Sequence, residues 1–247
     1  MIPFLSAVWS DLILISYAVP DAALEPYLAP GLEPDRWEGS AWCSLVAFDF
    51  TQTRVLGWSV PYPRSLCDFA EFNLRLYVRR GGQRGVVFVR ELAPNPLTCG
   101  LARLLYNEPY TAVPITSRVT QVGDLRRVRH DFVVDGRPQM AAVSARGPAA
   151  LPPPDGFEAW VKEQEAGFGR SRFGGQATGF RVWHPPWRTY PVESFDLAVD
   201  FGRLYGDRWR SLQGRAPDSV TLAEGSQIAI YPNETYPNET YPTDKRP

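Results

Sequence analysis

Lysine is almost absent from this chain. Of its 26 basic residues, 24 are arginines, and only Lys162 and Lys245 are lysines. Lys245 lies in the terminal tail, and the pattern around Lys162 predicts an exposed helix, so we expect neither amine to be desolvated. Schiff-base chemistry requires a desolvated or otherwise activated lysine, and the sequence therefore argues against it.

Cysteine and histidine are also scarce. The three cysteines, Cys43, Cys67 and Cys99, are widely spaced and form no C-x-x-C pair, and His130 and His184 are the only histidines. Neither a zinc site nor a disulfide framework is expected from this usage, which is typical of a cytoplasmic protein. The chain also lacks G-x-S-x-G, P-loop, H-E-x-x-H and G-x-G-x-x-G motifs, so no cofactor is predicted.

Charge and hydropathy exclude two further classes of partner. The net charge is −1, from 26 basic and 27 acidic residues, and no long basic run occurs, so binding to nucleic acid is not expected. The apolar run at residues 12–15 is too short for a membrane span and has no cationic leader or cleavage site, so neither a signal peptide nor a membrane partner is expected. A small-molecule ligand is the expected partner. The oligomeric state stays open, and a homo-oligomer is compatible with the sequence.

The most informative segment is F-A-E-F-N-L-R-L-Y-V-R, residues 69–79. Strict alternation places its apolar side chains on one face of a strand and its polar ones on the other. The polar row consists of Glu71, Asn73, Arg75 and Tyr77. The following segment, Gly85–Leu92, begins with residues that are apolar on both faces, which predicts a covered neighbouring strand. The row therefore indicates an enclosed polar pocket, with a salt bridge on a solvated face as the alternative.

The remaining pattern predicts a strand-dominated α+β fold with a few short helices. Asp135-Gly136 is a strong hairpin signal. The proline run at 147–154 leaves open a division into two subdomains, but a single domain over residues 1–230 is the preferred prediction. Residues 231–247 repeat Y-P-N-E-T and predict a disordered tail. Strands are expected at 9–17, 42–50, 54–60, 69–79, 85–92, 112–122, 125–134, 139–145, 178–184, 192–199 and 220–230, and helices near 21–28, 97–105, 155–165 and 201–205.

Several segments together resemble the bacterial YqjF-like family, a group of unknown function related to acetoacetate decarboxylases. They are residues 9–17, G-S-A-W-C-S-L-V at 39–46, F-A-E-F-N-L-R-L-Y-V at 69–78, G-V-V-F-V-R at 85–90, A-R-L-L-Y-N-E-P-Y at 102–110, H-P-P-W at 184–187 and L-A-E-G-S at 222–226. The resemblance covers nearly the whole chain up to the tail. It implies an antiparallel, cone-like β-barrel with an internal cavity. It does not imply Schiff-base decarboxylation, since the nucleophilic lysine of that enzyme has no expected counterpart here, whereas Glu71 resembles its cavity glutamate.

These observations lead to one functional hypothesis and two alternatives. The hypothesis is a cavity for a small ligand bearing a carboxylate or a carbonyl. In it, Arg75 binds the anion, Glu71 exchanges a proton in lysine-independent acid–base chemistry, and Asn73 and Tyr77 orient the ligand. Further ligand contacts are expected from Tyr110, His184 and Trp187, although a packing role is the more common one for such a histidine. The alternatives are a non-catalytic binding or sensing module, and a structural protein with a buried ion-pair network. The sequence does not decide whether the protein is an enzyme.

Overall fold

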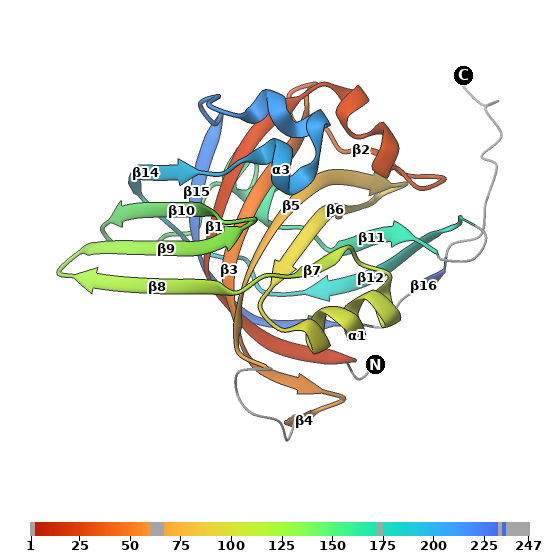
Figure 1. Cartoon of the computed structure of the whole chain (residues 1–247), viewed down its shortest axis with the longest axis horizontal. Coiled ribbons are helices and arrows are strands. Elements are labelled where there is room, and N and C mark those ends of the chain that lie inside the picture. Colours follow the sequence, from red (N-terminus) through yellow and green to blue (C-terminus); the bar gives the residue numbers. More distant parts are fainter. Residues whose placement is uncertain (1–2, 60–66, 172–174, 232–233, 236–247) are drawn as a thin grey trace.

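The computed structural model describes residues 3–59, 67–171, 175–231 and 234–235 (Figure 1). Within these residues no helix has the length and apolarity needed to cross a membrane. The chain is strand-dominated with a few short helices, as the sequence predicts.

Twelve strands, long and short, form one sheet. Four of its strands are consecutive antiparallel neighbours in the order β15-β1-β3-β5, and β5 continues into β6 through a tight hairpin at Arg80 and Gln83. This hairpin joins the strand of the polar row to its predicted apolar neighbour. The strands of this sheet are β1 Leu5–Val19, β2 Glu33–Pro34, β3 Ala41–Val55, β4 Trp58–Ser59, β5 Phe69–Arg80, β6 Gln83–Ala93, β7 Tyr110–Ala112, β11 Ala166–Arg170, β12 Ala177–Trp183, β13 Thr189–Tyr190, β15 Ser219–Ile230 and β16 Glu234–Thr235.

The path of paired strands returns to its starting point. Beyond β6 it runs through β11 and β12, and β12 pairs with β15 at Val182 and Trp183. Two of the pairings are parallel: β6 with β11, at Val86 and Gly167, and β6 with β7. The expected all-antiparallel arrangement therefore holds for the central strands and fails at β6, where the sheet is mixed.

Two glycines allow close approaches in this sheet. A Cβ on Gly85 would lie 2.4 Å from the carbonyl oxygen of Ala166, at the place where β6 meets β11. Gly225 has a positive φ of 82°, and a Cβ there would lie 2.0 Å from the Trp9 carbonyl oxygen. It pairs with Ser10 next to Asp11, which also has a positive φ and lies where the register between β1 and β3 shifts. Both positions require glycine, because a side chain would clash with a backbone oxygen that cannot move aside at small cost.

A second sheet of four antiparallel strands projects from the first and lies at the left of Figure 1. Its order is β14-β10-β9-β8, and β9 and β10 are joined at Asp135-Gly136, where both residues have the positive φ of the predicted turn. The strands are β8 Ile115–Val122, β9 Leu125–Val134, β10 Arg137–Arg146 and β14 Val192–Ala198.

The helices are short. Asn95 caps α1 by accepting from the amides of Leu97 and Thr98, and Asn107 ends it in the left-handed conformation. The sequence predicts that Asp155 caps the next helix, but the cap of α2 is Gly156 and no side chain bonds there. The expected helix at 21–28 is a pair of 3-10 turns. The elements are η1 Asp21–Ala23, η2 Glu25–Tyr27, α1 Pro96–Tyr106, α2 Phe157–Lys162, α3 Phe201–Tyr205 and η4 Asp207–Leu212.

The main sheet separates two clusters of buried side chains. Phe72, Leu74, Leu76 and Val78, the predicted apolar face of β5, lie in the larger cluster, which also includes residues of the second sheet, α3 and η4. Tyr77 belongs to the other cluster, with aromatic residues of β3 and α2. The alternation predicted for β5 is therefore confirmed, and its polar row lies on the face opposite to the larger cluster.

Most of the predicted tail, residues 231–247, lies outside the described residues. Its described part includes β16, which pairs with β12 at Thr178 and Gly179.

Candidate functional site

The four polar side chains of β5 are all buried. Glu71 is 3% exposed, Asn73 2%, Arg75 8% and Tyr77 0%. A buried row of charged and polar groups is costly unless each group has a partner, so its surroundings decide what it can do.

A cavity of about 530 Å³ lies next to this row. Six of the seven predicted site residues line it; Tyr77 does not, but its hydroxyl accepts a hydrogen bond from Arg75 Nε at 3.3 Å and donates to Ser44 Oγ at 2.6 Å. Most of the wall is apolar and aromatic. Polar wall residues that the sequence analysis did not single out include Glu91, Glu108, Lys162 and Gln164. The predicted residues on the wall are Glu71, Asn73, Arg75, Tyr110, His184 and Trp187.

Arg75 is held by neutral groups. Its Nη2 donates to the carbonyl oxygen of Val161 at 2.8 Å, and its guanidinium lies over the ring of Tyr77 at 5.4 Å. Within residues 3–59, 67–171 and 175–231, no carboxylate oxygen lies within 4.0 Å of it. Arg75 and Glu71 therefore form no ion pair, and the buried guanidinium keeps an uncompensated positive charge at the cavity wall.

Lys162 corrects the sequence prediction. It was expected on an exposed helix, but it is the last residue of α2, is only 2% exposed, and lines the cavity. Its ammonium forms an ion pair with Glu163, whose other carboxylate oxygen lies 3.7 Å from His184 Nδ1. The last four residues of α2, Ala159 to Lys162, are all buried, so this end of the helix is covered on every side and has no exposed face.

His184 and Trp187 pack together beside this group. Their rings are stacked with centroids 3.9 Å apart, and the Trp187 backbone amide donates to Glu163 at 3.1 Å. Burial lowers the pKa of His184, and the positive charges of Lys162 and Arg75 lower it further, against the Glu163 charge and a hydrogen bond to Pro185. The His184 imidazole is therefore neutral at neutral pH. A neutral ring is compatible with the predicted ligand contact and with a packing role.

At the other end of the polar row, three buried carboxyl groups meet. Glu71 accepts from Asn73 Nδ2 and from Tyr110 Oη, each at 3.0 Å, and hydrogen-bonds with Glu91, which in turn bonds with Glu108. The sources are β5 for Glu71, β6 for Glu91 and the segment just before β7 for Glu108, and the last two strands are parallel neighbours. We call Glu71, Glu91 and Glu108 the glutamate cluster.

Burial keeps protons on the glutamate cluster. It raises the pKa of Glu71 to about 7, against the hydrogen bonds from Asn73 and Tyr110, and the pKa of Glu108 to about 8, where the charge of Glu71 adds to the effect. The pKa of Glu91 is also raised, first by burial and then by its two acidic neighbours. A carboxyl group with a pKa near neutrality can give or take a proton at physiological pH.

No three His, Cys, Asp or Glu side chains of the described residues are arranged so that they could hold a metal ion. The glutamate cluster instead bonds internally.

Comparison with known families identifies the chain. Residues 6–227 match DUF2071, described as an uncharacterized conserved protein. The chain belongs to this family. The resemblance found in the sequence is confirmed by a relative, the uncharacterized protein YqjF of Bacillus subtilis (strain 168). The two are 32% identical over 102 residues, 41% of each chain, so the match spans less than half of that relative.

Solved structures show the fold of this DUF2071 protein. An acetoacetate decarboxylase-like enzyme from Sphingomonas wittichii RW1 matches with a TM-score of 0.65 at 11% identity, over 94% of this chain and 92% of that one. The acetoacetate decarboxylase of Legionella pneumophila matches with a TM-score of 0.63 at 12% identity, over 95% and 87%. MppR, an enduracididine biosynthesis enzyme solved with pyruvate, matches with a TM-score of 0.62 at 16% identity, over 95% and 91%.

Sequence reasoning missed four polar residues of this DUF2071 cavity. Glu91 follows the apolar start of its strand. The face on which its side chain lies could not be predicted, because the register of the β5–β6 pair shifts between Leu74 and Arg75. Glu108 is next to a proline and resembles an ordinary turn carboxylate. Lys162 is the last residue of the six-residue helix α2, and Gln164 follows it two residues later. A signal was present for Glu108 alone, because N-E-P-Y also supplies Tyr110.

Proposed function

We propose that this DUF2071 protein binds a small carbonyl acid in its cavity and exchanges a proton with it. Arg75 receives the carboxylate, and Glu71 is the proton-transfer group. Asn73 and Tyr110 position the Glu71 carboxyl group, Tyr77 positions Arg75, and His184 and Trp187 border the ligand. The cavity is the interior of a cone-like barrel in this proposal, as the returning strand path and the acetoacetate decarboxylase-like neighbours support.

The observation that carries the proposal is the missing counter-charge of Arg75. A buried guanidinium normally has an anionic partner, because an uncompensated buried charge is strongly unfavourable. Here the described residues supply only a carbonyl and a phenol, so a ligand carboxylate would complete the site through charge-assisted bonds. Lys162 adds a second positive charge, partly offset by Glu163.

The spacing along β5 fits a proton transfer close to the bound carboxylate. Glu71 and Arg75 are four residues apart on one face, roughly 13 Å between Cα atoms at 3.3 Å per residue. Both side chains line the same cavity, so a ligand that occupies it lies between them. In the proposed step, the Glu71 carboxylate takes a proton from the carbon beside the ligand carbonyl, and the electron pair of that C–H bond moves to form an enolate. Return of a proton to the same carbon completes the exchange.

The burial of Lys162 supports a second candidate reaction. In it, the Lys162 ammonium passes a proton to Glu163, and the freed amine adds to the ligand carbonyl and loses water to form an imine. The prediction of lysine-independent chemistry depended on an exposed Lys162, and that premise is wrong. Sodium borohydride treatment separates the two candidates, since only an imine leaves a mass increment on the protein that Lys162→Met removes.

Ligand binding tests the main proposal. Calorimetry with levulinate and pyruvate should give measurable affinity for the wild type. Arg75→Ala should weaken it by about 30-fold or more, because a buried charged contact is lost. Arg127→Ala removes an exposed arginine paired with Asp196 at 3.0 Å and is the matched control, for which no change is expected. Equal binding by both variants, or none by the wild type across a panel of carbonyl acids, would overturn the proposal.

A further inference from the structure

The glutamate cluster has more hydrogen-bond acceptors than the protein satisfies. Glu91 Oε1 and Asn73 Oδ1 are buried and have no hydrogen-bond partner among the described residues. Both residues line the cavity and are 2% exposed, and they are cross-strand partners in the β5–β6 pair. Two unsatisfied acceptors therefore lie side by side at the same end of the cavity.

The orientation of the Asn73 amide is fixed by its own hydrogen bond. Its nitrogen donates to Glu71 Oε1 at 3.0 Å, so its oxygen is the atom left without a partner. The same holds for Gln164, whose amide nitrogen donates to the Trp160 carbonyl at 2.7 Å while Oε1 has none. The Tyr110 hydroxyl is a donor nearby, and its proton is already used by Glu71.

Three of the four unsatisfied polar atoms on the cavity wall are oxygens: the amide oxygens of Asn73 and Gln164, which only accept, and Glu91 Oε1, which accepts when that carboxyl group is ionised. The fourth is a donor, Trp9 Nε1, on an aromatic wall where Trp9 packs against Phe48 and Trp187. Buried acceptors without partners are costly, so a ligand that occupies this space would be expected to bring donors. Aromatic faces also attract a cation.

The size of the cavity leaves room for a second polar group on the ligand. At about 530 Å³ it lies within the range of pockets that enclose drug-sized molecules, and a three-carbon acid would fill only part of it. Arg75 and Lys162 lie toward one end of the polar row and the glutamate cluster toward the other. The two ends therefore differ in the sign of charge that they favour.

From this we infer that the ligand is an amino carbonyl acid: its carboxylate binds at Arg75, and a protonated nitrogen binds at the glutamate cluster, donating to Glu91 Oε1 and Asn73 Oδ1. The inference rests on the proposed function and adds the cationic group to it. A cation at this place also allows the three neighbouring carboxyl groups to ionise together, which their mutual repulsion otherwise opposes.

A matched ligand pair tests the inference without altering the protein. Levulinate and 5-aminolevulinate share the carboxylate and the carbonyl, and only the second carries an ammonium group at neutral pH. Calorimetry should show 5-aminolevulinate binding about tenfold tighter or more, as expected for charge-assisted hydrogen bonds in a buried site. 5-Hydroxylevulinate, which donates without a charge, should bind more weakly than the ammonium compound.

The outcomes separate the inference from the proposed function. Levulinate binding as tightly as 5-aminolevulinate overturns the inference and leaves the carboxylate site at Arg75 intact. Equal affinity for the hydroxyl and ammonium compounds overturns the cationic assignment. Failure of all three ligands to bind overturns both proposals.

A variant then assigns the effect to the glutamate cluster. Glu91→Gln keeps the size of the side chain and removes its charge, so the preference for 5-aminolevulinate should fall at least tenfold while levulinate affinity stays the same. Glu193→Gln, an exposed glutamate paired with Arg146, is the control. A preference that survives Glu91→Gln in a folded protein, judged by a native-like circular dichroism spectrum and a cooperative melting transition, would overturn the placement of the cation.

Discussion

Charged side chains are paired differently in the cavity and on the four-stranded sheet. On the sheet, arginines and acids pair in the open: Arg127 with Asp196 at 3.0 Å, and Arg146 with both Asp124 and Glu193. In the cavity, no carboxylate of the described residues pairs with Arg75, and the glutamate cluster holds three like groups together. Among the described residues, the sheet supplies an acidic partner for each of these arginines, whereas the cavity supplies none for Arg75. The proposed carboxylate ligand would remove this difference.

The largest effect is expected at Glu71. Replacing it with glutamine removes the proton-transfer group and keeps the size of the side chain, so exchange of the hydrogens beside the ligand carbonyl should slow by about 10²–10⁴-fold. Proton NMR of levulinate in D₂O measures this exchange above the rate without protein. Levulinate affinity should stay near that of the wild type. An exchange rate that the substitution leaves unchanged would assign the chemistry elsewhere.

The glutamate cluster should make the protein less stable as pH rises. Folded Glu71 and Glu108, with pKa values of about 7 and about 8, keep protons that the unfolded chain releases above its ordinary value of 4.5. The free energy of unfolding therefore falls between about pH 4.5 and pH 8, by about 1.4 kcal/mol per pH unit for each proton retained. Urea titrations at pH 5, 6.5 and 8 measure this slope. Glu108→Gln should flatten it, and an unaltered slope would contradict the raised pKa values.

The second sheet should respond in the opposite direction. The exposed Asp131 bonds to Arg129 at 2.6 and 2.7 Å, and this hydrogen bonding lowers the pKa of the carboxyl group below its ordinary 3.8. Its contribution is present above pH 3.8 and is lost as pH falls through the lowered value. Because the pair is solvated, Asp131→Asn should cost no more than about 1 kcal/mol at pH 7. The difference from the wild type should vanish in acid; a difference that persists there would point to packing instead.

The smallest effect is expected for Arg127→Ala, which breaks one exposed pair on the same sheet. The free energy of unfolding should change by about 0–1 kcal/mol, and by less in 0.5 M salt, because solvent and salt screen the attraction. Chemical denaturation at two salt concentrations measures it. A loss comparable to that of a cavity substitution would remove the contrast between the two regions.

Sequence patterns predicted local features well, but they did not predict which distant segments meet at the cavity. The two faces of β5 and the hairpin at Asp135-Gly136 follow from alternation and turn chemistry, which act over a few residues. The position of Lys162 depends on α2 lying against β5 and β6, where Arg75 and Arg84 bond to the carbonyls of Val161 and Trp160. No periodicity in a six-residue helix determines which side of it faces a distant sheet.

The composition of the glutamate cluster was hidden for a similar reason. Glu71 was found because it shares a strand with other polar residues, but Glu91 and Glu108 come from segments 20 and 37 residues later. They meet because β6 and β7 pair in parallel, a pairing that the expected antiparallel sheet does not contain. Six of the seven predicted residues line the cavity, although their roles stay predictions.

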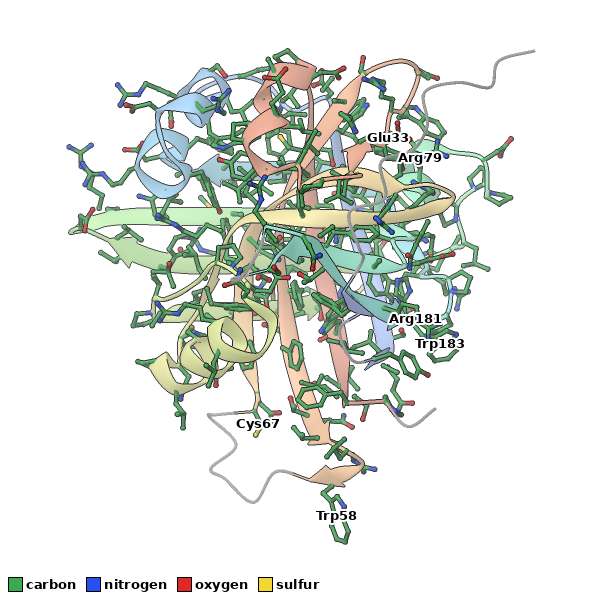
Figure 2. The ribbon with its side chains drawn as sticks, turned by 90° about the vertical axis from the view of Figure 1, so that its right-hand side faces the viewer. Glu33, Trp58, Cys67, Arg79, Arg181 and Trp183 are labelled. Atoms are coloured by element: carbon green, nitrogen blue, oxygen red, sulfur yellow. The ribbon has the colours of Figure 1, made fainter. Side chains whose placement is uncertain are left out.

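The outer edge of the molecule is less informative. In Figure 2, Trp58 points away from the body at the tip of the β3–β4 hairpin, and Cys67, which belongs to the cavity wall, lies near this lower end. An exposed tryptophan alone does not mark a site.

The alternation of β5 has a consequence for how the gene for this protein can change. Losing one codon between those for Glu71 and Arg75 would reverse the two faces of the strand on one side of the deletion. Phenylalanine and leucine would then enter the cavity, and carboxylate or guanidinium groups would be forced into the larger apolar cluster. Point substitutions alter one wall position at a time, whereas a change in length alters them all. We therefore expect lineages of this protein to vary in the identity of these residues long before they vary in their spacing.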